Sequence, residues 1–318
     1  MAGDAFSPAS LHSSGRRRSS KSLRRRERGV LASLAGATSL SVFVTLAITL
    51  VLGSETVSFF SRFEEVSLLE FLTGGTWSPQ LGSTKHFGIW PLISGTLLIA
   101  SIALSVAVPL GLVTAIYLSE YAHPRVRAFI KPALELLAGI PTVVYGFLAL
   151  TLITPVIRGS ILPSLGMFNA LSAGIAVGIL ILPIVASLAE DAFRAVPQSL
   201  RDGVYGLGGT RFDAAVKVVF PAATSGVVSA VLLAMARAVG ETMIVALAAG
   251  SMARLTLDPT SEVQTITGFM VQMALGDVSN FGVEYFSMYA VAFVLFVMTM
   301  VLTIIGAIIR RRFREEYE

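Results

Sequence analysis

The chain contains no cysteine, only three histidines and few charged residues. Without cysteine it has no disulfide, no thiolate zinc site and no cysteine nucleophile. His12, His86 and His123 lie far apart and outside the apolar stretches, so they form neither a metal-ligand pattern nor a catalytic triad. A phosphate-binding loop of the Gly-x-x-x-x-Gly-Lys-Ser/Thr type is also missing. We therefore expect no catalytic residue, no metal and no cofactor on this chain, and any ATP must bind to another protein.

The scarcity of charge indicates a membrane protein. Charged residues make up 14% of the sequence and hydrophobic residues 54%, whereas about a quarter of a soluble domain is charged. Six apolar stretches are each long enough to cross roughly 30 Å of hydrocarbon, and each must be helical because lipid offers the backbone no other partner. The expected fold is all-α and integral to the membrane. The expected spans are about Val30–Gly53, Pro91–Leu118, Pro132–Ile157, Asn169–Ala189, Ala222–Gly250 and Tyr285–Ile309.

Basic residues gather in the segments that six spans would place on one side. That distribution predicts a multi-pass protein of the cell membrane with both termini in the cytoplasm, and it accounts for the net charge of +4. We expect a disordered basic tail over residues 1–29, a six-helix domain over 30–312 and a cytoplasmic end over 313–318. The tail fits a topology signal better than a site for nucleic acid or anionic lipid. The basic residues on that side lie in the tail (Arg16, Arg17, Arg18, Lys21, Arg24, Arg25, Arg26, Arg28), after the second span (Arg125, Arg127, Lys131), between the fourth and fifth spans (Arg194, Arg201, Arg211, Lys217) and at the C-terminus (Arg310, Arg311, Arg312, Arg314).

A polar segment, Val196–Pro221, lies within the connector of residues 190–222 between the fourth and fifth spans. Its glycines, Gly208 among them, permit a sharp turn. Thr210 then has Asp213 three residues further on, which is the arrangement of a capping box. The pattern predicts two short helices, although an amphipathic loop on the membrane surface fits it equally well.

The spacing of three residues in this segment resembles the cytoplasmic loop by which ABC importer permeases bind their ATPase. Asp202 is followed six residues later by Gly208, and Pro221 comes before the next span. Other positions depart from the family pattern, since Gly203 and Val204 stand where alanine is usual. The resemblance implies that this loop transmits the closure of an ATPase to the spans. Phe212 is then expected to be an aromatic anchor in a groove of the partner, with Arg211 at its polar rim.

Four further stretches are similar to phosphate importer permeases of the PstC type, and together they extend the resemblance over about residues 30–312. It implies the type I ABC importer permease fold in a chain that hydrolyses nothing itself. The implied partners are a second permease subunit of the PstA type, a pair of ABC ATPases that bind ATP and magnesium, and an external phosphate-binding protein. The stretches are Phe71–Pro79, Ala115–Ala122, Glu135–Phe147 and Arg237–Met243.

Arg237 and Glu241 lie one helical turn apart within the fifth expected span. Arg237 is roughly 22 Å along that span, and a central charge costs at least about 2.5 kcal/mol to insert, so the pair should face the bundle interior or a watery cavity. Arginine offers an oxyanion two parallel hydrogen bonds. Glu241 would orient that fork, and Thr242 would add a hydroxyl donor. A purely structural ion pair remains the alternative.

The third expected span carries candidates for structure or gating. Pro141 removes a backbone donor and should kink the span, and with Gly139 and Gly146 nearby the kink would let another helix approach closely or act as a hinge. We expect Glu135 to pair with Lys131, one turn earlier. Outside the spans, Trp77 and Trp90 are expected to anchor at the headgroup level. The stretch Gly174–Gly178 has the small-residue spacing of tight helix packing.

Other classes of function make different demands. An ion-coupled secondary transporter would work without an ATPase, with Glu241 or Glu135 relaying protons, and such proteins usually contain repeats that are not visible here. An intramembrane enzyme lacks paired catalytic groups in the spans, and a scaffold leaves Arg237 unexplained. Within the permease class, molybdate or sulfate remains an alternative to phosphate. Lipid is an expected partner, and nucleic acid is not.

Overall fold

The computed structural model describes residues 20–79, 85–276 and 282–312, and the chain divides into two compact units, residues 1–51 and 52–318. Helix α1 (Ser20–Arg62) begins in the first unit. We expected residues 1–29 to be disordered, but residues 20–29 are helical, because lysine, leucine, arginine and glutamate there are good helix formers. Residues 1–19 lie outside the described residues, as does the expected cytoplasmic end, 313–318.

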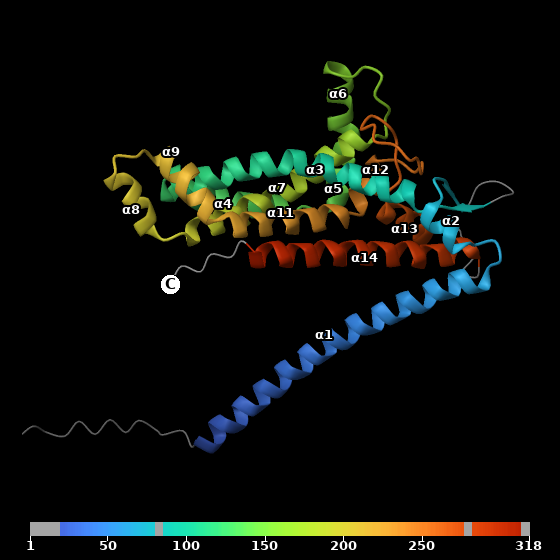
Figure 1. Cartoon of the computed structure of the whole chain (residues 1–318), viewed down its shortest axis with the longest axis horizontal. Coiled ribbons are helices and arrows are strands. Elements are labelled where there is room, and N and C mark those ends of the chain that lie inside the picture. Colours follow the sequence, from blue (N-terminus) through green and yellow to red (C-terminus); the bar gives the residue numbers. More distant parts are fainter. Residues whose placement is uncertain (1–19, 80–84, 277–281, 313–318) are drawn as a thin grey trace, which may run out of the picture. The chain divides into compact units, whose positions relative to one another are not determined.

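Over its described residues, the second unit is built from helices, with one short antiparallel pair of strands (Figure 1). The strands are β1 (Trp77–Ser78) and β2 (His86–Phe87). Three π-helical turns, Tyr117–Tyr121, Ala149–Ile153 and Ala215–Val219, interrupt or extend helices. The helices are α2 (Leu68–Thr73), α3 (Trp90–Ile116), α4 (Pro124–Ala138), α5 (Thr142–Leu148), α6 (Thr154–Ser160), α7 (Ala170–Ala195), α8 (Gln198–Gly206), α9 (Arg211–Ala214), α10 (Phe220–Ala222), α11 (Thr224–Val239), α12 (Met243–Ala248), α13 (Ile266–Leu275) and α14 (Val283–Arg312).

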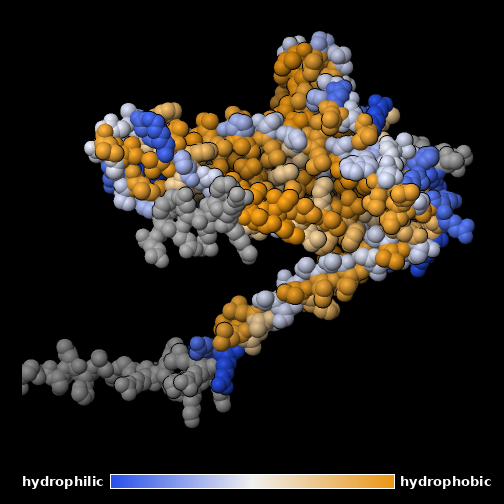
Figure 2. Space-filling view, in the orientation of Figure 1, coloured by the Kyte–Doolittle hydropathy of each residue, from blue (hydrophilic) through white to orange (hydrophobic). Residues whose placement is uncertain are grey.

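Among the described residues, five helices are long and apolar enough to cross a membrane, and a sixth span is formed if a bent pair is counted as one. The bent pair joins residues 211–222 to α11 at an angle of 71°. Counted in that way, the spans are as many as the six expected from the sequence, and the structure is the expected all-α membrane fold. On the face that Figure 2 shows, apolar side chains cover the long helices of the second unit, and hydrophilic side chains gather around α2 and around α8 and α9.

Two expected spans are broken rather than continuous. The third was expected over Pro132–Ile157 with a kink at Pro141, but α4 ends at Ala138 and Pro141 caps α5. Proline cannot donate to the carbonyl four residues back, and its ring clashes with that carbonyl. The fifth was expected over Ala222–Gly250, yet α11 ends at Val239 and α12 starts at Met243. Both breaks lie next to candidate residues.

Helices α3 and α7 pack against each other along their length and form the centre of the unit. Small residues make the close approach possible. A Cβ atom at Gly174 would come within 2.6 Å of Ile102, and one at Gly178 within 3.0 Å of the Ala103 carbonyl oxygen. The packing interpretation of this pair of glycines is therefore confirmed, and α3 is the partner helix. Helix α11 packs against α3, α7 and α14.

An aromatic cluster surrounds the two strands, which lie at the end of the unit opposite α8 and α9 (Figure 1). Trp77 stands edge-on to Phe71, Phe87 and Phe269 at centroid distances of 6.3, 6.0 and 5.0 Å. Each such pair contributes about 0.5–1.5 kcal/mol beyond the burial of its area. The expectation that Trp77 anchors at the lipid headgroups is wrong, because its side chain is buried in this cluster. Trp90 is half-exposed, and its Nε1 donates to the Leu72 carbonyl (2.8 Å).

Candidate functional site

The polar segment folds as two short helices joined by a tight turn. Helix α8 ends at Gly206, and Gly208 follows with φ +82°, a left-handed conformation in which a Cβ atom is strained. The predicted capping box is confirmed. The Thr210 hydroxyl accepts from the Asp213 amide (3.2 Å), and the Asp213 carboxylate accepts from the Thr210 amide (3.0 Å). The segment therefore has the two short helices that the sequence pattern predicts.

Asp213 also accepts a hydrogen bond from Lys217 (2.6 Å). This contact, followed by the bonds from Thr210, holds the pKa of Asp213 well below its usual range. The carboxylate that starts α9 is therefore charged at any physiological pH. Asp202 is exposed and accepts from Gln198 (3.1 Å), one turn earlier on α8. Pro221 lies in α10, just before the bend to α11.

The segment presents apolar side chains to solvent. Leu207 is 92% exposed, Phe212 65% and Val216 45%. Exposed apolar groups at a tight turn and on a short capped helix form a rigid, incompletely buried surface, which is typical of a docking site for another protein. Arg211 is exposed beside Phe212 and lines a polar hollow with Arg194 and Arg201. The anchor and rim roles of Phe212 and Arg211 stay predictions.

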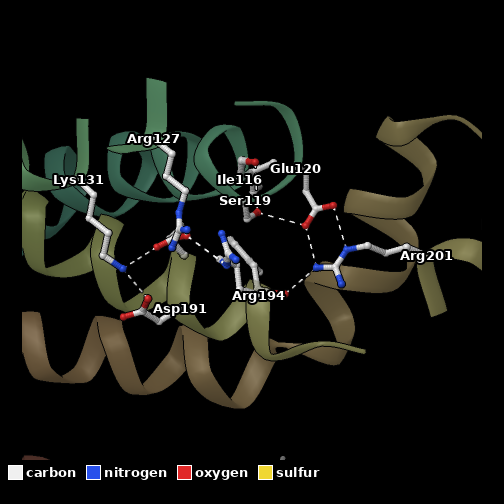
Figure 3. Close-up of polar contacts among 10 residues, drawn as sticks. Ile116, Ser119, Glu120, Arg127, Lys131, Asp191, Arg194 and Arg201 are labelled. Carbon is white, nitrogen blue, oxygen red and sulfur yellow. Dashed lines mark hydrogen bonds and ion pairs between the residues drawn. The ribbon is translucent and has the colours of Figure 1, made fainter. Parts of the chain in front are cut away.

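A buried ion pair ties α8 to the end of the α3 helix (Figure 3). The Arg201 guanidinium donates to both carboxylate oxygens of Glu120 (2.9 and 3.2 Å) and to the carbonyls of Val196 (2.6 Å) and Phe193 (2.8 Å). The side chain of Glu120 is 5% exposed and that of Arg201 9%. All three nitrogens of the guanidinium donate hydrogen bonds, two of them to the carboxylate, so the contact fixes the orientation of both side chains as well as adding binding energy. The Arg201 side chain therefore links α8 to the end of α3 and to the end of α7.

A second cluster joins α4 to α7 (Figure 3). Glu190 is fully buried and accepts from Arg127 (2.7 Å) and Lys131 (2.8 Å), while Asp191 accepts from Lys131 (2.6 Å). Burial lowers the pKa of Lys131, but the hydrogen bonds from its amine to Asp191 and Glu190 outweigh that effect, so the pKa is raised. Removing one partner of such a buried pair typically costs about 3–5 kcal/mol.

The expected pair of Lys131 with Glu135 is wrong. Lys131 turns to α7 instead, because a fully buried carboxylate there gains more from a cation than an exposed one does. Among the residues that the structure describes, Glu135 pairs with no basic side chain. The sequence analysis also missed Glu120 and Glu190. A signal for Glu190 was present in the sequence. Glu190 and Asp191 follow the fourth expected span, on the same side as the basic residues after the second span, so ion pairs between the two could have been expected.

Arg237 and Glu241 form the expected ion pair, although not on one continuous helix. Arg237 lies in the last turn of α11, and Glu241 lies in the break that follows. Their Nη1 and Oε2 atoms are 2.7 Å apart. Glu241 is 2% exposed, and its other oxygen accepts from the Ile244 amide (3.3 Å). The Arg237 side chain is 39% exposed. The Glu241 carboxylate is therefore buried and held by two hydrogen bonds, while the Arg237 guanidinium lies on a partly exposed side chain.

The remaining candidates lie at the two breaks. Thr242 is half-buried, and its hydroxyl donates to the Gly240 carbonyl (3.2 Å). Gly139 ends α4, and Pro141 opens α5. The close approach expected of this stretch occurs at Gly146, where a Cβ atom would come within 2.9 Å of Leu247 on α12. Helices α5 and α12, the segments after each break, thus pack together. None of the described contacts joins Glu135 to Arg237 or Glu241.

Comparisons with known proteins place this arrangement among transporters. The family model described as binding-protein-dependent transport system inner membrane component matches residues 107–315. The probable ABC transporter permease protein YqgH of Bacillus subtilis is 35% identical over 261 residues, 82% of this chain and 83% of that protein. The phosphate transport system permease protein PstC of Haemophilus influenzae is 32% identical over 290 residues, 84% of this chain and 88% of its own.

A solved structure supports the fold. The inward-facing MetNI methionine ABC transporter superimposes with a TM-score of 0.53 at 17% identity, over 72% of this chain and 95% of that one. At that identity the similarity concerns the fold, and it confirms the type I ABC importer permease fold expected from the sequence.

Proposed function

This chain belongs to the family of binding-protein-dependent transport system inner membrane components, and we propose that it is the transmembrane subunit of an ATP-driven phosphate importer. The chain is a multi-pass protein of the inner membrane and is a permease rather than an enzyme. Phosphate is proposed because relatives called phosphate transport system permease protein PstC cover more than four-fifths of it.

The observation that carries the substrate assignment is the Arg237–Glu241 pair at the broken fifth span. Only one nitrogen of the Arg237 guanidinium is bonded to a described residue. The others lie on a side chain that is partly open, and a planar fork with unused donors suits a tetrahedral oxyanion. Glu241 offsets the positive charge and so keeps the binding weak enough for release. Thr242 adds a hydroxyl donor on the same break.

Coupling to the ATPase is proposed to run through α8 and α9. Their exposed face, with Phe212 and Leu207, docks on an ATPase that binds ATP and magnesium on its own chain. The Arg201–Glu120 pair then passes the movement to α3. Asp202, Gly208 and Pro221 shape the segment, and the basic residues on this side support a cytoplasmic location for it and for both termini.

The rest of the proposed assembly is suggested by the family and by the PstC relatives. It supplies half of a translocation pathway, and a second permease subunit of the PstA type supplies the other half. An external phosphate-binding protein delivers the substrate to the end that bears β1 and β2. Gly139 and Pro141 form a hinge between α4 and α5, and Glu135 lies exposed beside it.

The test is uptake of radiolabelled phosphate by proteoliposomes that contain this chain with its neighbouring permease, ATPase and binding protein. We expect ATP-dependent uptake that unlabelled phosphate reduces and that sulfate and molybdate do not. Competition by sulfate or molybdate would replace phosphate with another oxyanion. Uptake by this chain alone without ATP would contradict the importer and favour an ion-coupled transporter.

A further inference from the structure

A hollow of about 300 Å³ lies beside the strands, at the end of the second unit opposite α8 and α9. Strand β1 meets there the connector after α12 and helix α13, which are far from β1 in the sequence. The lining is mixed. Its apolar part is Pro79, Met252, Ala253 and Phe269, and the other lining residues are Trp77 and Ser78 of β1, Ser251 and Arg254 of the connector, Gln264 before α13 and Gln272 within α13. This hollow is separate from the Arg237–Glu241 pair and from the polar segment.

Two hydrogen-bond donors at or beside the hollow have no acceptor among the described residues. The side chain of Trp77 lines the hollow, and its Nε1 atom is buried beside it without a partner among the described residues, while its ring packs against Phe269 at a centroid distance of 5.0 Å. Buried indole N–H groups usually find an acceptor. Gln264 is buried and donates to the Oε1 atom of Gln272 (2.5 Å). That bond orients the Gln272 amide, and no described residue accepts from its Nε2 group.

The charge of the hollow is positive. Arg254 is exposed at its rim, and the guanidinium makes no ion pair with a described residue. The two acids of the same connector do not line the hollow, and both accept hydrogen bonds from nearby residues. Glu262 accepts from the Ser251 amide (2.9 Å), and Asp258 accepts from Thr260 (2.9 and 2.8 Å), contacts that lower the pKa of Asp258. Donors and a cation without a lining carboxylate suit an anion rather than a metal ion.

We propose that this hollow binds a tetrahedral oxyanion, phosphate under the proposed function, at the outer mouth of the pathway before the anion reaches Arg237. The inference rests on that function, which places β1 and the connector after α12 on the external side. One arginine with neutral donors makes a weak site, which suits an anion in transit.

The first test is a binding measurement on the purified full-length chain in detergent, and it does not require transport. In a Trp90→Phe background, Trp77 is the one remaining tryptophan of the chain. We expect inorganic phosphate to change its fluorescence saturably. Arg254→Gln should raise the half-saturating concentration roughly tenfold or more. Arg62→Gln removes an exposed arginine outside the hollow and should leave it unchanged. The inference is overturned by a flat titration or by equal responses of the two variants.

The second test uses the assembled importer in proteoliposomes with phosphate-loaded binding protein. We expect Arg254→Gln to lower phosphate uptake while the binding protein still stimulates ATP hydrolysis. A parallel loss of stimulation and uptake would mean that Arg254 contacts the binding protein, and unchanged uptake would give it no role. Both results overturn the inference. If the wild-type assembly takes up no phosphate, the proposed function fails, and the fluorescence titration still reports on the hollow.

Discussion

At the scale of single residues, the Arg237 guanidinium is bonded on one side and open on the other. One nitrogen binds the buried Glu241, and the rest of the guanidinium lies on an open face. Simple truncation is a poor test of its function, because it leaves Glu241 buried without a cation at a cost of about 3–5 kcal/mol. A variant that keeps the charge separates substrate binding from structure.

Arg237→Lys should therefore lower phosphate uptake and leave assembly intact. Lysine preserves the ion pair but presents a single ammonium in place of the planar fork. The loss of one charge-assisted hydrogen bond corresponds to roughly 10- to 100-fold in the uptake rate. The measurement is the initial rate in proteoliposomes, with the amount of copurified partner subunits as the control. Normal uptake would show that Arg237 acts only through its pairing with Glu241.

Asp213 gives a prediction about pH. Its pKa is lowered, chiefly by Lys217, so the contribution of the capping contact is present above the unfolded value of about 3.9 and is lost only as the pH falls through the still lower folded value. Asp213→Asn should then reduce coupled uptake by the same factor at every pH from about 5.5 to about 8. The measurement is the ratio of mutant to wild-type uptake across that range. A ratio that approaches one at the acidic end would mean that the carboxylate is protonated there.

At the scale of elements, the turn between α8 and α9 depends on one backbone conformation. Gly208 has a positive φ, and a Cβ atom placed there would meet nothing within 4 Å. The strain of a substitution is therefore conformational, about 1–2 kcal/mol for an alanine. Gly203 also has open space around it, but its φ is ordinary and it lies inside α8. The two glycines form a matched pair.

Gly208→Ala should loosen the docking segment and lower the phosphate taken up per ATP hydrolysed. Gly203→Ala should leave that ratio unchanged, because alanine is a better helix former than glycine. The measurement is uptake and ATP hydrolysis on the same proteoliposomes, with the amount of inserted chain as the control. Equal ratios in the two variants would remove the turn from the coupling mechanism.

The elements that could be predicted are those whose cause is local. The capping box needs only Thr210 and Asp213, and the turn needs only glycine. The break after α11 contains no proline, and one of its contacts comes from a distant residue, since the Thr267 hydroxyl donates to the Glu241 carbonyl (2.5 Å). The Glu241 carboxylate also accepts from the amide of Ile244, which is only three residues away. The partners of Glu190 were missed for the same reason, because they come from another helix.

At the scale of the whole molecule, helix α6 of the second unit presents an apolar face that the described residues leave uncovered. Helix α6 stands apart from the long helices (Figure 1). Leu152, Val156 and Ile161, in and beside it, are all more than half exposed. Lipid can cover such a face, but a pathway shared by two subunits needs an interface, and α5–α6 is the span that follows the break at Pro141. We infer that the second permease subunit packs here.

The absence of cysteine makes this interface directly testable, because every introduced thiol is unique in the chain. Val156→Cys should cross-link to cysteines scanned along the second permease subunit. Val113→Cys, on an equally apolar and exposed position of α3, should not. The readout is the shifted band of the cross-linked pair after treatment with a short bifunctional reagent in native membranes. Cross-linking from Val113 with none from Val156 would assign the subunit interface to α3 and leave α6 in lipid. In that case the Arg237 face would have to be enclosed by other helices of the assembly.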